Sequence, residues 1–194
     1  MIARDRGDVD AAYSSLSAIR DKSAQLGFKG TAVNIAVELA QIDMGRNDWV
    51  KARDELTDLV YRTEKDPEAT EVSLLALCYA KSGNIKERDA TLRRALALRV
   101  GTTLRRRIFA AKLALAQVEN AGAGPLRAAD RLLEIADKAE RRFWIANALE
   151  ARLVAWQLLA NANDSRAEPL RTSIESSARQ HGFGWILARL DRKP

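Results

Sequence analysis

A short pattern recurs along this chain at intervals of about forty residues. In the clearer copies a turn residue is followed by an apolar side chain, a small residue at the start of a helix, and a leucine one turn later. Arg88 replaces the small residue in the third copy, and the last copy, at residues 163–167, is weaker. The small-residue position is held in turn by Ala12, Ala52, Arg88, Ala129 and Ala167, with spacings of 40, 36, 41 and 38 residues. A period of this length is typical of stacked repeats, in which no single unit buries its apolar face alone. The repetition therefore predicts a series of similar units that depend on their neighbours.

Apolar residues recur at helical spacing through nearly the whole chain, and no segment shows the alternation of a half-buried strand. Gly, Asn and Asp fall between the periodic stretches, where they end one helix and start the next. The pattern predicts an all-α protein of about nine helices, over residues 9–26, 31–45, 48–65, 68–82, 86–99, 103–119, 125–140, 143–161 and 166–180. Residues 185–190 are expected to form a short terminal turn.

The third copy of the pattern is the closest to a known repeat family. Before the turn at Gly83 it reads Val72-x2-Leu75-Ala76-x2-Tyr79. These residues resemble the tetratricopeptide repeat (TPR) family, whose first helix carries a large residue, Leu, Gly and Tyr at this spacing. The units of this chain are longer than the family's usual length of about 34 residues. The resemblance is therefore to a TPR-like architecture.

This resemblance implies a right-handed superhelix of stacked antiparallel helix hairpins, a TPR-like α-solenoid. It implies a single domain over residues 1–194, with repeats at about 1–27 (partial), 31–66, 68–100, 103–140 and 143–182, and a cap at 183–194. Small residues such as Ala52 are expected to let paired helices approach closely. The space between the helices is expected to be filled by Leu16, Leu56, Leu92 and Leu133. Because the first unit lacks its first helix, we expect the chain to be a fragment of a longer protein.

The composition includes few of the residues that catalytic and metal sites commonly use. One cysteine and one histidine exclude an internal disulfide and a His-rich metal site. Cys78 lies in an apolar helical run, where we expect burial, and His181 lies beside a glycine, where we expect a surface or helix-capping position. No apolar stretch approaches the roughly 20 residues of a membrane span, and the N-terminus has no signal-peptide core. We therefore expect a cytoplasmic protein that is not an enzyme, with no cofactor, no metal site and no membrane partner.

The resemblance also implies a concave groove lined by the first helix of each repeat. The groove positions of the second and third units are Asn34, Val37, Gln41, Ser73, Leu77 and Lys81. Only Asn34, Gln41 and Lys81 among them carry polar hydrogen-bonding side chains, so the family's pattern for gripping an acidic peptide terminus is largely missing. We expect the groove to bind another protein or peptide, as a helix or an extended segment, mainly through apolar contacts.

Three consecutive arginines, Arg105, Arg106 and Arg107, are the most distinctive polar feature of the chain. Residues 1–70 carry 10 basic and 13 acidic groups, whereas residues 71–194 carry 22 basic and 13 acidic groups, so the excess positive charge lies in the second part. The arginines fit an anion contact, with an acidic peptide, a phosphate group or a nucleic acid. They also fit a solvated helix start, or pairing with neighbouring carboxylates, because basic runs are common on helical repeats. Both interpretations stay open at this point.

The segment from Ser176 to Arg189 is similar to a tail found in helical-repeat regions of bacterial regulatory proteins. This similarity implies a sensory or regulatory part of a larger bacterial regulator. The first hypothesis is therefore a non-enzymatic protein–protein interaction or scaffolding module. The alternative is binding of nucleic acid or another polyanion through the basic region 93–107. Exposed apolar faces at terminal repeats also leave a homo-oligomer open.

Overall fold

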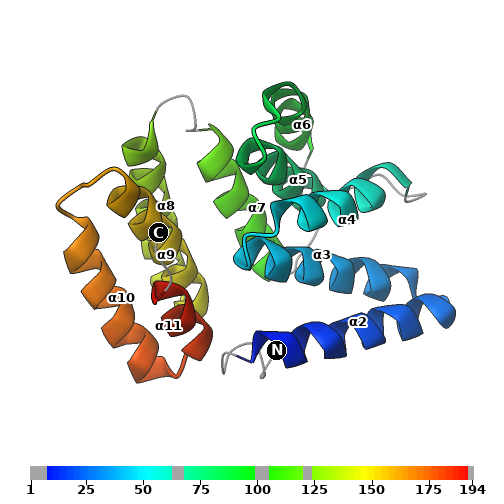
Figure 1. The fold of residues 1–194 in the computed structure, drawn as a ribbon, viewed down its shortest axis with the longest axis horizontal. Coiled ribbons are helices and arrows are strands. Elements are labelled where there is room, and N and C mark those ends of the chain that lie inside the picture. The colour runs from blue at the N-terminus through cyan, green and yellow to red at the C-terminus, as the bar shows by residue number, and fades with distance from the viewer. Residues whose placement is uncertain (1–7, 63–67, 99–104, 120–123, 192–194) are drawn as a thin grey trace. The chain divides into compact units, whose positions relative to one another are not determined.

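The computed structural model describes residues 8–62, 68–98, 105–119 and 124–191 (Figure 1). Within these residues the chain forms ten α-helices and no strand. The helices are α2 (Val9–Gln25), α3 (Lys29–Gly45), α4 (Trp49–Arg62), α5 (Ala69–Lys81), α6 (Ile85–Ala97), α7 (Arg105–Glu119), α8 (Pro125–Glu140), α9 (Ile145–Asn161), α10 (Ala167–His181) and α11 (Gly184–Leu190). The all-α fold class is confirmed. The expected terminal turn is a seven-residue helix, α11.

Six of the turns between consecutive helices share one backbone geometry. In each, one residue adopts a left-handed conformation, and the next N–H donates to the carbonyl five residues earlier, over 2.8 to 3.0 Å. This is the Schellman motif, which satisfies carbonyls at the end of a helix. The left-handed residues are Gly27, Asn47, Gly83, Phe143, Asn163 and Gly182.

Five of these six residues are Gly or Asn, the types that adopt this conformation most readily. Phe143 is the exception, with a φ of 59°. The apolar pattern predicts a helix from residue 143, but α9 begins at Ile145 and Phe143 belongs to the turn. That prediction is wrong because an apolar side chain does not reveal a turn position normally held by Gly or Asn.

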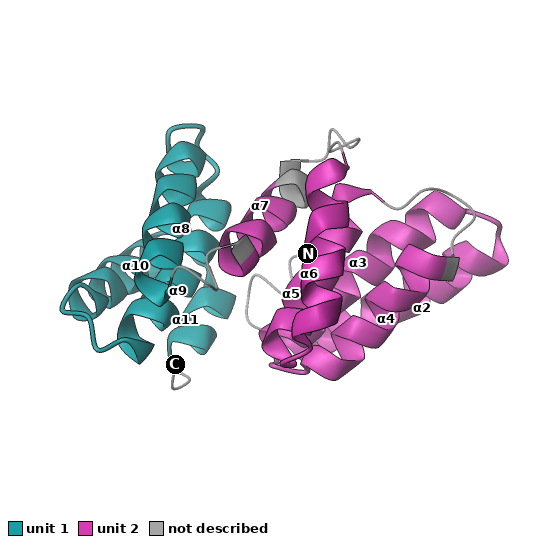
Figure 2. Cartoon of the chain, turned by 90° about the horizontal axis from the view of Figure 1, so that it is seen from above, with its two compact units in different colours: residues 1–8, 119–194 teal, residues 9–118 magenta. Residues whose placement is uncertain are grey.

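The chain divides into two compact units, one of residues 9–118 and one of residues 1–8 and 119–194 (Figure 2). In the first, each helix from α2 to α5 packs on the next one along the chain. Their core includes the fully buried Leu56, Val72 and Leu75, and α7 adds Ala110 and Ala114 to the same cluster.

The second unit is built around α9, which packs against α8, α10 and α11. Its core joins Leu153 and Trp156 of α9 to Ile174 of α10 and Ile186 of α11. The short helix α11 therefore buries apolar side chains on its neighbours, as the expected cap would.

The small residues at the repeat position are mostly buried. Ala12, Ala52 and Ala129 are 5%, 0% and 0% exposed, as the pattern predicts. Leu56 is also fully buried. The remaining expected gap-filling residues are only half-buried, which corrects the prediction that they fill the core equally: Leu16, Leu92 and Leu133.

Candidate functional site

The groove positions on α3 and α5 differ in how far the fold covers them. Every residue of α5 from Ala69 to Cys78 is buried, because its apolar side chains join the core of the first unit on all sides. Ser73 and Leu77 of α5 are therefore 0% and 4% exposed, and Val37 of α3 is 1% exposed, so no ligand reaches these three positions without rearrangement. The polar candidates at these positions are less covered.

Asn34 and Gln41 lie two turns apart on α3, at a separation that places them on one face. Both are half-buried. The side-chain amide of Gln41 donates to the Val37 carbonyl at 3.4 Å, within its own helix. This face of α3 is therefore polar and partly accessible.

Lys81, at the end of α5, is exposed and contacts a different helix. Its Nζ lies 5.7 Å from the centre of the Trp49 ring at the start of α4, within the range of a cation–π contact. The side chain keeps contact with solvent, but the protein around its ammonium group removes part of the hydration, and this desolvation lowers the pKa of Lys81. The structure thus pairs Asn34 with Gln41 on α3 and pairs Lys81 with Trp49.

Arg105, Arg106 and Arg107 form the first turn of α7, but their side chains lie outside the described residues. Two arginines of the neighbouring basic segment are described. Arg93 is exposed, and the guanidinium of Arg94 lies 5.5 Å above the Tyr61 ring, which is 60% exposed.

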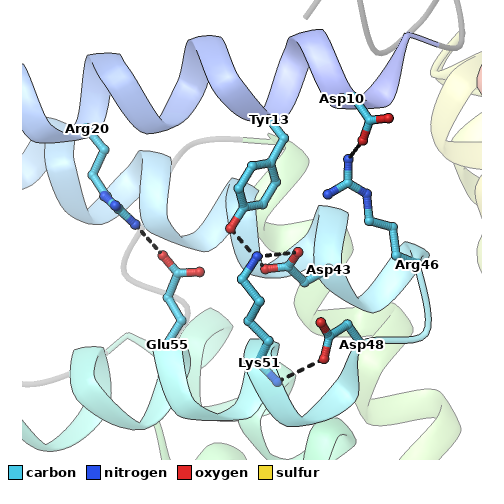
Figure 3. A network of polar contacts seen from close by, with 8 residues as sticks. All are labelled: Asp10, Tyr13, Arg20, Asp43, Arg46, Asp48, Lys51 and Glu55. Atoms are coloured by element: carbon cyan, nitrogen blue, oxygen red, sulfur yellow. Dashed lines mark hydrogen bonds and ion pairs between the residues drawn. The ribbon is translucent and has the colours of Figure 1, made fainter.

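A polar network that the sequence analysis missed joins α2, α3 and α4 (Figure 3). At its centre is Asp43, a carboxylate that is only 1% exposed. The Tyr13 hydroxyl donates to one Asp43 oxygen at 3.3 Å, and Lys51 Nζ donates to the other at 3.2 Å. Lys51 Nζ also lies 4.2 Å from the centre of the Tyr13 ring. A buried carboxylate held by two donors ties three helices together.

Two further ion pairs extend the network along α2. Arg46 pairs with Asp10, and Arg20 Nη1 donates to Glu55 Oε1 at 2.9 Å. Hydrogen bonding to Tyr13 raises the pKa of Lys51 even though burial acts in the opposite direction. Burial raises the pKa of Glu55, and Arg20 only partly offsets this effect.

The charged members of the network are held in hydrogen bonds and ion pairs between helices. One sequence signal points to it. Asp43 occupies the position at which the resembled repeat pattern has a tyrosine. A carboxylate in a position normally filled by an apolar ring needs donors from neighbouring helices.

Cys78 and His181 occupy different environments. Cys78 is fully buried, and burial raises the pKa of its thiol to about 12. His181 is the last residue of α10 and is exposed, with its ring centre 6.2 Å from that of Phe183. Among the described residues, no group of three or more His, Cys, Asp and Glu side chains is placed to hold a metal ion.

Several large apolar side chains remain in contact with solvent. On α2 and the turn that follows it, Ile19, Leu26 and Phe28 are 52%, 57% and 60% exposed. Ile19 lies on α2, and Leu26 and Phe28 follow directly after the helix ends at Gln25. We call these three residues the α2 apolar surface. The most exposed of all is Phe143, at 89%.

The chain matches no family model, no curated protein and no solved structure. In the described part of the chain, every helix is too short or too polar to cross a lipid bilayer.

Proposed function

We propose that this chain is a non-enzymatic protein–protein interaction module of TPR-like helix hairpins, stacked as a right-handed superhelix. Support for the stacking comes from the consecutive packing of α2 to α6 and from the Schellman turns that repeat between helices. The proposed role in the cell is that of a sensory or scaffolding part of a cytoplasmic bacterial regulator.

The observation that carries the proposal is the α2 apolar surface. Three large apolar side chains, each more than half exposed, lie within ten residues of one another in the chain. Contiguous exposed apolar side chains mark contact surfaces in soluble proteins, and we propose that these three residues form such a surface. The cation–aromatic contact of Lys81 and the polar face of Asn34 and Gln41 supply further sites for a partner in the same unit.

The test is selection of ligands from a phage-displayed library of random dodecapeptides on the immobilised full chain. We expect enriched peptides that contain apolar residues, because apolar contacts supply most of the proposed affinity. Binding of each synthetic peptide is then measured by fluorescence anisotropy. Leu26→Ser and Phe28→Ser are expected to weaken binding at least tenfold.

The matched control is Ile85→Ser, which makes the same kind of change at a side chain 61% exposed on α6. This variant is expected to bind as the unchanged chain does. If no peptide is enriched, or if the control and the α2 variants lose binding equally, the α2 apolar surface is not the binding surface.

The second candidate is binding of a nucleic acid through the basic segment 93–107. It is favoured by Arg94, which stacks on the exposed Tyr61, because stacked aromatic and cationic groups bind single strands. The test is a gel-shift titration with a labelled single-stranded oligonucleotide at several salt concentrations. Phosphate contacts predict affinity that falls steeply with salt, and Arg93→Gln is expected to reduce that slope. Absence of binding at low salt would exclude this candidate.

A further inference from the structure

The turn between α8 and α9 presents a group of basic and aromatic residues that the proposed function does not use. It comprises Arg141, Arg142, Phe143 and Trp144, and we call it the α8–α9 tip. It belongs to the unit of α8 to α11 (Figure 2), and α8 and α9 pack closely on either side of it.

The backbone of the tip is unfavourable for the residue that occupies it. Phe143 holds the left-handed position of a Schellman turn, where the five other described turns of this type have Gly or Asn. A bulky L-residue is strongly disfavoured in that conformation. The helix end itself therefore gives no reason for a phenylalanine.

Packing gives no reason for it either. The Phe143 side chain is 89% exposed, so it adds almost nothing to the core of its unit. Its neighbour Trp144 is half-buried, and the Arg142 guanidinium lies 5.4 Å from the centre of the Trp144 ring. A residue that is disfavoured by the backbone and contributes little packing is better explained by a contact outside the chain.

The charge around the tip is positive. The two nearest carboxylates of α8 are held by Arg152, with Arg152 Nη2 at 2.5 Å from Glu140 and 3.4 Å from Asp137. In the described part of the chain, neither Arg141 nor Arg142 forms an ion pair, and both are exposed. The tip therefore presents two exposed arginines directly before Phe143 in the chain, and neither forms an ion pair with a described residue.

We propose that the α8–α9 tip binds an acidic segment of a partner protein, with Phe143 in an apolar contact and the two arginines on carboxylates. Aromatic and arginine side chains are the types that carry most of the energy at protein interfaces. Guanidinium groups pair with carboxylates through two parallel hydrogen bonds, which adds specificity for an acidic segment. The inference rests on the proposed function, and it names a partner chemistry and a second surface.

Two other anionic partners fit the tip less well. Stable membrane anchoring takes two strong signals, whereas the tip offers a single fully exposed aromatic ring for insertion. Binding of single-stranded nucleic acid uses several aromatic rings along a groove, on which successive bases stack. A protein segment needs only one apolar contact flanked by carboxylates.

The experiment uses the same library of random dodecapeptides on the full chain, followed by measurements with variants of the tip. Peptides that bind the tip are expected to combine Asp or Glu with an apolar residue. Their affinity is expected to fall at least tenfold in Phe143→Asn and in Arg142→Gln, and to weaken as salt is raised from 50 to about 300 mM. Asn suits the left-handed backbone, so Phe143→Asn removes the ring without disturbing the turn.

The matched controls lie on α8 of the same unit. Leu126→Asn removes an apolar side chain that is 42% exposed, and Arg127→Gln removes an exposed charge. Both are expected to retain full binding.

The outcomes separate this inference from the proposed function. Peptides that lose affinity in Leu26→Ser but not in Phe143→Asn would support the proposed function and overturn the inference about the tip. The inference is also overturned if the peptides whose binding depends on Phe143 contain no acidic residues. Vesicles of phosphatidylcholine with 30% phosphatidylserine, and a labelled oligonucleotide, serve as further probes. Binding to either that depends on Phe143, without an acidic peptide that does so, would overturn the assignment to a protein partner.

Discussion

Replacing Phe143 with asparagine is expected to stabilise the second unit, even though the change removes a large apolar side chain. Phe143 has a φ of 59° and is 89% exposed. Asparagine adopts the left-handed conformation readily, because its short polar side chain forms local hydrogen bonds there. The substitution therefore relieves backbone strain and leaves the core unchanged.

The magnitude follows from two opposing terms. The left-handed conformation costs an ordinary L-residue roughly 1–2 kcal/mol. The buried part of the ring is about one tenth of a surface of roughly 200 Å², so its loss costs about 0.5 kcal/mol at roughly 25 cal/mol per Å². The free energy of unfolding of this unit is expected to rise by about 0.5–1.5 kcal/mol.

Urea denaturation followed by tryptophan fluorescence measures the change in unfolding free energy of the unit that contains Phe143. Three of the four tryptophans, Trp144, Trp156 and Trp185, lie in the unit that contains Phe143, and the fourth lies in the other unit. With a denaturant dependence of about 1–3 kcal/mol per M, the midpoint is expected to move upward by some tenths of a molar unit.

Phe143→Ala is the matched control, since alanine removes the ring but keeps the conformational strain. Its free energy of unfolding is expected to stay within about 0.5 kcal/mol of that of the unchanged chain. Equal stability of the alanine and asparagine variants, or a loss of stability in the asparagine variant, would refute the argument from strain. A stabilised variant that no longer binds acidic peptides would also show that binding is lost without unfolding.

Three other predictions concern the first unit. Leu56→Ala removes a fully buried side chain and is expected to lower the free energy of unfolding by about 2–5 kcal/mol, whereas Leu92→Ala, at a half-buried position, is expected to lower it clearly less. Equal losses of stability in thermal melts would contradict the assigned core. Because burial raises the pKa of Cys78 to about 12, the thiol of the folded chain is protonated at pH 8, and we expect Ellman's reagent to react with it only as urea unfolds the chain. A fast reaction in buffer without urea would show that α5 is accessible. Asp43→Ala leaves the hydroxyl of Tyr13 and the ammonium of Lys51 without their shared acceptor, and it is expected to lower the free energy of unfolding by about 1–3 kcal/mol. A urea midpoint equal to that of the unchanged chain would show that the network adds no stability.

The positions of the helices follow closely from the sequence. Within the described residues the expected ranges agree with the observed ones to within about two residues, and α8 agrees at both ends. The expected ends at residues 65, 99 and 103 lie outside the described residues. Small residues such as Ala52 and Ala129 are buried at the positions that the repeat pattern predicts. These features depend on neighbouring residues and on backbone bonds that span five positions or fewer, so a local pattern carries the information.

The candidate binding surfaces are harder to predict from a local sequence pattern. The groove positions Val37, Ser73 and Leu77 are covered by side chains from other helices, which the repeat pattern does not reveal. Asn34, Gln41 and Lys81 remain candidates, but the resemblance does not say that Lys81 faces Trp49. Whether a position is open depends on residues that lie far away in the chain.

Local sequence patterns were sufficient to predict the helical fold class, most of the turns and the small residues that let helices approach, but not the turn at Phe143. The tertiary structure alone decided that α5 is enclosed over its first ten residues, that Tyr13 and Lys51 meet at Asp43, and that Phe143 stands exposed in a left-handed turn. The physical reason is the range of the interactions. Helices and turns arise from bonds between residues a few positions apart, whereas burial and charge pairing arise where segments about thirty or more residues apart, such as Tyr13 and Asp43, come into contact.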